Sequence, residues 1–130
     1  MGVPVEFISG KGPVFADSIC KNEKLRLNSD GALKKLEYVF EATSLIKSSI
    51  DVPLIGFTGS PWTLFVYLYY GESPKNHDEL NNYLKLKSHN THSYLEQLTE
   101  TTKDYVHAQI EAGADCIQIF DSWGGLLDEK

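Results

Sequence analysis

The chain has 130 residues, of which 42% are hydrophobic and 12% aromatic, a composition typical of one globular domain rather than of a disordered tail. Its net charge is −6, and Arg26 is the single arginine among its 12 Lys and Arg residues. This balance excludes a sequence-independent grip on nucleic-acid phosphates, which depends on clustered Lys and Arg.

The spacing of the cysteines and the length of the apolar runs predict where in the cell the protein resides. Cys20 and Cys116 belong to no metal-binding or redox spacing, which favours reduced thiols in a cytosolic protein. The first residues lack the combined features of a secretory signal, and no apolar run is long enough to cross a bilayer. We therefore expect a cytoplasmic protein that binds neither membranes nor nucleic acids.

The first part of the chain combines strand signals with a helix. Residues 1–15 alternate apolar and smaller side chains before a glycine-rich turn, which predicts a strand or a hairpin arm. Residues 16–28 predict a polar connection. Ser29 or Asp30 is expected to cap a helix that ends before Pro53. Its apolar residues recur at helical spacing and predict one broad face: Leu33, Leu36, Val39, Phe40, Ile46 and Ile50.

The middle of the chain predicts a strand, a tight loop and the start of a helix. Residues 52–57 form a short apolar run without alternation, as expected of a parallel strand that is covered on both faces. Gly59 is expected to make the turn. Ser60 suits the N-cap of the next helix, and Pro61 suits its first position, where no amide hydrogen is needed.

The second half predicts further helices. Residues 71–76 interrupt the helix that starts at Pro61, and apolar residues then recur at helical spacing over 80–86. A longer helix with one apolar side follows over 94–110. Gly113 suits the left-handed position that closes it.

A second buried strand is predicted over 114–120, ending in Asp121, Ser122 and a flexible loop over 123–125. The alternation of strands and helices predicts an α/β fold with parallel strands, either an open doubly wound sheet or part of a (β/α) barrel. In both folds, ligands bind at the carboxyl ends of the strands. The candidate site therefore lies just after each of the two predicted strands.

The aromatic segment after the first of these strands has two interpretations. Small residues in the loop can let a ligand approach the backbone, while Tyr67 points its hydroxyl back toward the end of the strand. Alternatively, Trp62, Phe65 and Tyr67 only pack in the core, which is the commoner use of aromatic residues at helical spacing.

Other polar residues carry weaker signals. Ser122 can donate a hydrogen bond to a ligand, or Asp121 or Ser122 can cap the next element. His89 and His92 share a probable helix face, but no Cys or acidic residue completes a ligand set, so we expect no metal site. Residues 10–13, "GKGP", lack the other features of a phosphate-binding loop.

Three blocks of the sequence carry a family resemblance. "VPLIGFTGSPWTLFVYLYYGES" and "AQIEAGADCIQIFDSWGG", preceded by "MGVPVEFISGKGP", are similar to the middle of the uroporphyrinogen decarboxylase family over essentially all 130 residues. The resemblance implies part of a (β/α)8 TIM-type barrel, incomplete in this chain, as one unit over residues 1–130. It also implies a homodimer when complete, and a carboxy-lyase of haem biosynthesis without cofactor or metal. The implied substrate is uroporphyrinogen III, whose acetate side chains lose carbon dioxide to give coproporphyrinogen III.

The resemblance also implies site residues. Tyr67 matches the substrate-site tyrosine of the family, Ser122 matches its substrate-binding serine, and Phe57 is expected to line the apolar wall. The aspartate, arginines and histidine of the family's site lie outside this stretch, so no catalytic residue is assigned here. We therefore expect a partial gene product that is inactive by itself.

Two alternatives remain open at this stage. A corrinoid-related methyltransferase has a similar barrel, but it binds zinc through His and Cys ligands in its later half. A truncated remnant without catalytic activity is the other alternative, and it would bind a partner through its exposed strand edges.

Overall fold

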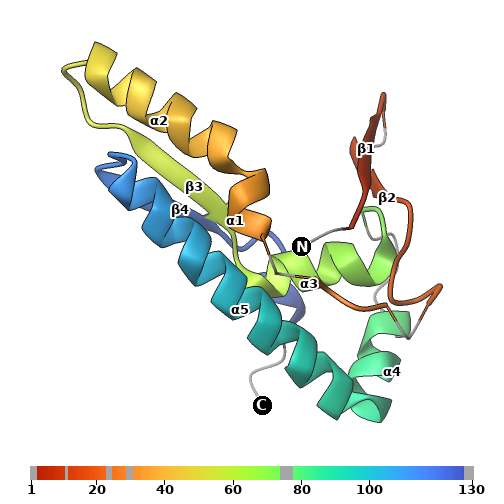
Figure 1. Cartoon of the computed structure of the whole chain (residues 1–130). Helices are drawn as coiled ribbons and strands as arrows, with labels where there is room; N and C mark the ends of the chain where they lie inside the picture. Colours follow the sequence, from red (N-terminus) through yellow and green to blue (C-terminus); the bar gives the residue numbers. More distant parts are fainter. Residues whose placement is uncertain (1–2, 11, 23–24, 29–30, 74–77, 128–130) are drawn as a thin grey trace.

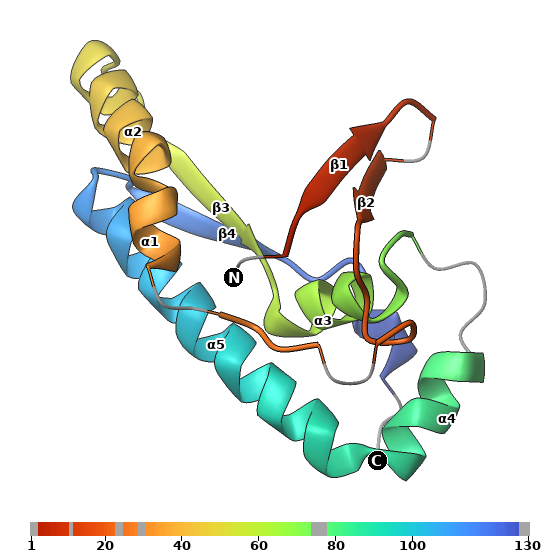
Figure 2. The same ribbon diagram turned by 45° about the vertical axis from the view of Figure 1, so that its right-hand side comes forward.

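The N-terminal segment forms the predicted hairpin. The structure is a computed structural model that describes residues 3–10, 12–22, 25–28, 31–73 and 78–127. Strands β1 (Val5–Ile8) and β2 (Gly12–Phe15) pair antiparallel, with Val5 opposite Phe15. The hairpin stands beside α3, apart from the other two strands (Figures 1 and 2). The Phe15 amide donates to the Gly71 carbonyl at 2.7 Å, which holds the hairpin against the end of α3.

The predicted first helix is divided in two. Helix α1 (Ala32–Lys35) and helix α2 (Glu37–Ser49) meet at Leu36, whose φ of −104° and ψ of 8° interrupt the helical geometry. Ser29 and Asp30, predicted as caps, lie outside the described residues, and Gly31 with φ 69° precedes α1.

The broad apolar face predicted for this helix is only partly covered in α2. No residue of α2 is buried, and Leu45 is 70% exposed. The ring of Phe40 contacts that of Tyr105 at 5.8 Å, and the Ser44 hydroxyl donates to the Ala112 carbonyl at 2.9 Å. These few contacts leave most of the apolar side of α2 open.

The two predicted buried strands pair in parallel. Strands β3 (Ile55–Gly59) and β4 (Cys116–Phe120) align Ile55 with Cys116 and Gly59 with Phe120. Helix α5 (Ser88–Glu111) runs along them (Figure 1). Because α5 covers one face only, the prediction that both faces are covered is wrong: Gly56 and Thr58 are buried, whereas Phe57 is 62% exposed.

The remaining helices form as predicted. Helix α3 (Pro61–Tyr70) begins after Ser60, whose side chain accepts a hydrogen bond from the Thr63 amide at 3.0 Å. It ends at Gly71, whose φ of 77° suits a residue without a side chain. Helix α4 covers Asp78–Leu86, and Gly113 with φ 108° follows α5.

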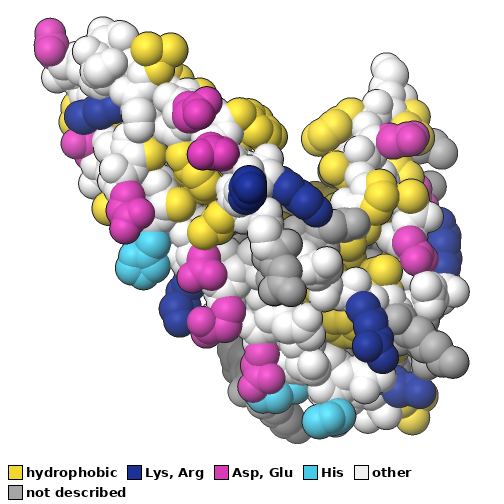
Figure 3. Space-filling view, in the orientation of Figure 1, with side chains coloured by type: hydrophobic (Ala, Val, Ile, Leu, Met, Phe, Trp, Pro, Cys, Tyr) yellow, Lys and Arg dark blue, Asp and Glu magenta, His cyan; other side chains and the backbone are white. Residues whose placement is uncertain are grey.

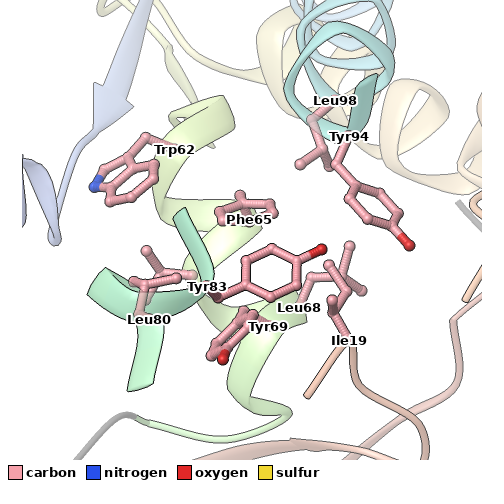
Figure 4. Close-up of a cluster of buried hydrophobic side chains, with 10 residues drawn as sticks. Ile19, Trp62, Phe65, Leu68, Tyr69, Leu80, Tyr83, Tyr94 and Leu98 are labelled. Carbon is pink, nitrogen blue, oxygen red and sulfur yellow. The ribbon is translucent and has the colours of Figure 1, made fainter. Parts of the chain in front are cut away.

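The core lies between α3, α4 and α5. Figure 4 shows the aromatic rings of this cluster gathered around Phe65, which is 0% exposed. Burial raises the pKa of the Tyr69 hydroxyl to about 12, so this group stays protonated and donates to the Glu79 carbonyl at 3.3 Å. The buried cluster consists of Ile19, Trp62, Phe65, Val66, Leu68, Tyr69, Leu80, Tyr83, Tyr94 and Leu98.

The predicted polar connection contributes to this core. Ile19 is fully buried, and its amide donates to the Leu68 carbonyl at 3.1 Å. The neighbouring Cys20 amide donates to the Tyr69 carbonyl at 3.1 Å. Cys20 and Cys116 are both free, exposed thiols. The connection therefore forms one wall of the core rather than a solvated link.

The architecture is mixed α/β. Across the described ranges, the strands form two separate two-stranded sheets, β1–β2 and β3–β4, and no closed barrel. Within those ranges, no helix has the length and apolar character that a bilayer crossing demands.

Candidate functional site

The candidate site lies where the parallel strands β3 and β4 end. The Ser60 amide, just after β3, donates to the carbonyl of Phe120 at the end of β4 at 2.7 Å. The same serine caps α3. One residue therefore joins both strand ends to the start of the helix that carries Tyr67.

Asp121 strengthens this junction. Its Oδ1 accepts the hydroxyl of Ser60 at 2.6 Å and the hydroxyl of Thr63 at 3.0 Å. A carboxylate at the N-terminus of a helix is also favoured by the helix dipole. Asp121 therefore supports the start of the preceding helix, α3, through its side chain, while its carbonyl accepts the Gly124 amide at 3.2 Å.

The loop after β4 is anchored to α3. The Trp62 indole donates to the Trp123 carbonyl at 2.7 Å, and the Trp123 amide donates to the Thr63 hydroxyl at 3.4 Å. The turn continues as a short 3-10 helix over Gly124–Leu126. These bonds attach the predicted loop at 123–125 to α3, and its flexibility stays a prediction.

Tyr67 contacts the turn that contains Ser122. Tyr67 is half-buried, and its ring meets that of Trp123 edge to face, with ring centres 6.0 Å apart. Ser122 is exposed and lies between Asp121 and Trp123 in the chain. Both predicted groups therefore border the same turn at the carboxyl ends of the strands.

The packing interpretation of the aromatic segment is correct for two of its three residues. Trp62 and Phe65 stack at 5.8 Å within the core. Tyr67 lies on the other side of α3, against the turn that follows β4. Of the three rings, that of Tyr67 lies outside the buried cluster, and its contact with a ligand stays a prediction.

Phe57 lies on the open face of the sheet. Its ring contacts that of Phe120 at 6.2 Å, and Phe120 is 52% exposed. The two rings form an apolar surface on the side of the sheet that α5 does not cover. This placement agrees with the apolar wall expected of Phe57, and its contact with a ligand stays a prediction.

Gln109 on α5 positions Phe57, and the sequence analysis did not identify it. Its side-chain oxygen accepts the Phe57 amide at 3.1 Å, and its side-chain nitrogen donates to the Phe57 carbonyl at 3.3 Å. Gln109 is 4% exposed. Its place on the apolar side of the predicted helix was a signal that could have identified it, because a buried side-chain amide requires hydrogen-bond partners.

The histidines form no metal centre in the described part of the chain. His92 lies 3.1 Å from Glu96 on the exposed surface of α5. Within that part, no group of three or more His, Cys, Asp and Glu side chains could hold a metal ion. The junction after β3 and β4 is lined instead by hydroxyls, aromatic rings and one carboxylate, Asp121.

These features define an α/β protein whose candidate ligand-binding groups follow the ends of a parallel strand pair. Over residues 1–130, the chain matches the family model described as uroporphyrinogen decarboxylase (URO-D). The chain belongs to the uroporphyrinogen decarboxylase family.

Individual relatives agree with this family. Uroporphyrinogen decarboxylase from Francisella tularensis subsp. novicida is 42% identical over 129 residues, 98% of this chain and 38% of the relative. The protein of the same name from Campylobacter lari is 39% identical over 133 residues, 100% of this chain and 39% of the relative. The chain thus spans 38% to 39% of the length of these curated relatives.

Proposed function

We propose that this chain is part of a uroporphyrinogen decarboxylase. The complete enzyme is a carboxy-lyase that removes carbon dioxide from the acetate side chains of uroporphyrinogen III and yields coproporphyrinogen III. The observation that carries this proposal is the family match over residues 1–130. It is supported by the contact between the rings of Tyr67 and Trp123, which places Tyr67 against the turn that contains Ser122.

The fold of the complete protein is a (β/α)8 barrel, of which this chain contributes a part. Parallel strands β3 and β4, connected through helices, are the repeating unit of such a barrel. The exposed side of β3 and β4 corresponds to the barrel interior, and the remaining length of the relatives supplies the other strands. The complete enzyme acts as a cytoplasmic homodimer.

The reaction needs no cofactor, because the substrate pyrrole accepts the electrons. Protonation of a ring carbon makes the pyrrole cationic, and the bond from the acetate methylene to the departing carbon dioxide breaks toward that ring. A proton then adds to the exocyclic methylene to form the methyl group, and the ring carbon releases the proton that it first gained, so that each decarboxylation consumes one proton overall. The protein contributes by binding and orienting the macrocycle and by handling protons.

Three residues of this chain take part in binding. The hydroxyls of Tyr67 and Ser122 hydrogen-bond to the substrate, and the ring of Phe57 covers an apolar part of the macrocycle. The paired Phe57 and Phe120 rings supply such a surface on the open side of the sheet. Asp121 and Gln109 hold the backbone from which these side chains project.

The chain by itself does not support turnover. A macrocycle that carries many carboxylates requires cationic partners, and this chain has one arginine and a net charge of −6. The rest of the enzyme must supply the missing guanidinium groups. We therefore expect no measurable substrate binding by the isolated 130-residue chain.

The test uses the full-length enzyme. Replacing Tyr67 by Phe removes one hydroxyl, and we expect kcat/KM for coproporphyrinogen formation to fall about tenfold, the effect of a hydrogen bond worth ~1.4 kcal/mol. Tyr38→Phe is the matched control, because Tyr38 is 67% exposed on α2. Equal activities of the wild type and Tyr67→Phe would remove Tyr67 from the site.

Metal analysis separates this proposal from a zinc-dependent methyltransferase on a similar barrel. The full-length protein should convert its substrate after treatment with a chelator and should carry no stoichiometric zinc. Stoichiometric zinc, with activity that depends on it, would contradict the decarboxylase assignment.

A further inference from the structure

A polar groove lies between the N-terminal connection and the first half of α5. It has a volume of about 680 Å³, which is within the range of small-molecule sites, roughly 300 to 1,000 Å³. It shares no lining residue with the candidate site at the ends of β3 and β4. The groove is lined by Leu25, Arg26, Leu27, Asn90, Ser93, Tyr94 and Gln97.

The charge of this groove is opposite to that of the chain. Arg26 is the single arginine of a chain with net charge −6, and among the described residues that line the groove there is no carboxylate. Two other grooves along α5 differ in this respect. One includes Glu96 and Glu100, and the other includes acidic residues of α2, such as Glu37.

The walls of the groove are held in place by hydrogen bonds. The Tyr94 hydroxyl donates to the Leu25 carbonyl at 2.6 Å, which attaches the connection to α5. Figure 4 shows this hydroxyl directed away from the aromatic cluster. On α5, the side-chain nitrogen of Gln97 lies 3.2 Å from the Ser93 carbonyl and 3.4 Å from its hydroxyl.

The lining combines one fixed charge with neutral polar groups. A guanidinium presents a planar set of donors that matches a carboxylate or a phosphate in two parallel hydrogen bonds. Asn90 and Ser93 add amide and hydroxyl donors along the helix, and Leu25 and Leu27 add apolar surface. This composition suits a small molecule with an oxyanion at one end and an apolar part at the other.

We propose that this groove binds a small metabolite with a carboxylate or phosphate group, at a site separate from the proposed substrate site. Arg26 holds the oxyanion, Asn90 and Ser93 donate to it, and the two leucines contact the apolar part. The proposal does not depend on decarboxylase activity, because it is measured as binding.

The experiment follows amide chemical shifts of the full-length, isotope-labelled protein during titration with inorganic phosphate and, separately, with succinate. Ionic strength is held constant with sodium chloride, so that general screening does not change. We expect saturable shifts at residues 25–27 and 90–97 with at least one probe. The probe that binds more tightly identifies the oxyanion. The absence of saturable shifts at these residues with both probes would overturn the proposal.

Variants test whether Arg26 binds the oxyanion. Arg26→Gln should weaken binding about tenfold or more, which corresponds to ~1.4 kcal/mol, and Arg26→Lys should restore only part of it, because an ammonium lacks the paired donors. Lys103→Gln is the matched control, since Lys103 is an exposed cation on α5 paired with Glu100 at 2.9 Å. Equal weakening by Arg26→Gln and Lys103→Gln would reduce the effect to net charge and contradict the proposal.

Discussion

Two phenylalanines in neighbouring elements have opposite environments. Phe65 on α3 is 0% exposed and packs among the rings of three helices, whereas Phe57 on β3 is 62% exposed beside Phe120. The difference shows that aromatic content alone does not identify the core. One region of the chain encloses its apolar side chains, and the other leaves them exposed.

The two regions are also held together differently. Apolar burial dominates the cluster around Phe65. At the strand ends, the Ser60 hydroxyl donates to Asp121, and in the middle of β3 the Phe57 amide donates to Gln109. Figure 3 shows hydrophobic side chains gathered on the hairpin and along α2 and β3, outside the helical core. These open surfaces agree with a chain that spans 38% of the length of a curated relative.

The largest expected effect comes from the helical core. Phe65→Ala should lower the free energy of unfolding by about 3 to 5 kcal/mol, because it removes a fully buried ring and leaves a cavity. Denaturant unfolding of the 130-residue chain, in which Phe57 is 62% exposed, measures this change. Phe57→Ala is the matched control and should have a small effect. A similar loss of unfolding free energy in Phe65→Ala and Phe57→Ala would show that the two regions do not differ in this way.

A smaller effect is expected at the support of β3. Gln109→Leu should destabilise the protein by about 1 to 3 kcal/mol, because both hydrogen bonds to the Phe57 backbone are lost inside the fold. Gln118→Leu, on the exposed side of β4, is the control. If amide exchange at Phe57 stays as slow in Gln109→Leu as in the wild type, the glutamine does not secure the strand.

Replacement of Asp121 should lower stability less than replacement of Gln109, and it should lower activity more. Asp121→Ala leaves the hydroxyls of Ser60 and Thr63 without this acceptor, at a cost of about 1 kcal/mol in a partly exposed site. In the full-length enzyme, loss of these bonds should also displace the turn that contains Ser122 and so lower kcat/KM. Asp104→Ala removes an exposed carboxylate from α5 as the control. Unchanged stability and activity in Asp121→Ala would show that the junction does not depend on this carboxylate.

The smallest effect concerns pH. The Lys47 ammonium and the Leu54 amide, both 2.7 Å from Asp115, hold the pKa of this carboxyl below its usual value of 3.8. A lowered pKa in the folded state stabilises the protein above the ordinary pKa, and this contribution disappears as pH falls through the folded value.

Acid unfolding of Asp115→Asn measures this contribution. The variant should be slightly less stable than the wild type at neutral pH, and the difference should shrink below about pH 4, near the ordinary pKa of aspartate. Asp104→Asn serves as the control. A difference that stays constant from neutral pH to the acid limit would contradict the role of the Lys47 contact.

Local patterns correctly predicted much of the fold. Ser60 and Pro61 predicted the start of α3, Gly113 predicted the end of α5, and the apolar run over 52–57 predicted β3. These features depend on neighbouring residues in the chain, because caps and turns are local interactions. The parallel pairing of β3 and β4 followed from the alternation of elements.

Burial and partners across the chain were not predictable in the same way. The break at Leu36, the exposed side of α2 and the burial of Ile19 depend on which elements meet in space. Gln109 and Asp121 likewise bond to residues far away in sequence, and no local signal names such partners.

The sequence by itself determined the family, the order of the helices and strands, and the candidate hydroxyls at Tyr67 and Ser122. The family follows from the resemblance of three sequence blocks to known relatives, which also names the two hydroxyls as candidates, and the order of helices and strands follows from the periodicity of apolar residues. Only the tertiary structure decided that Trp123 joins these two groups, that Phe57 lies on an open face, and that Arg26 borders a groove on α5. The physical reason is that exposure and hydrogen-bond partners are set by packing between distant segments, and a linear pattern does not specify that packing.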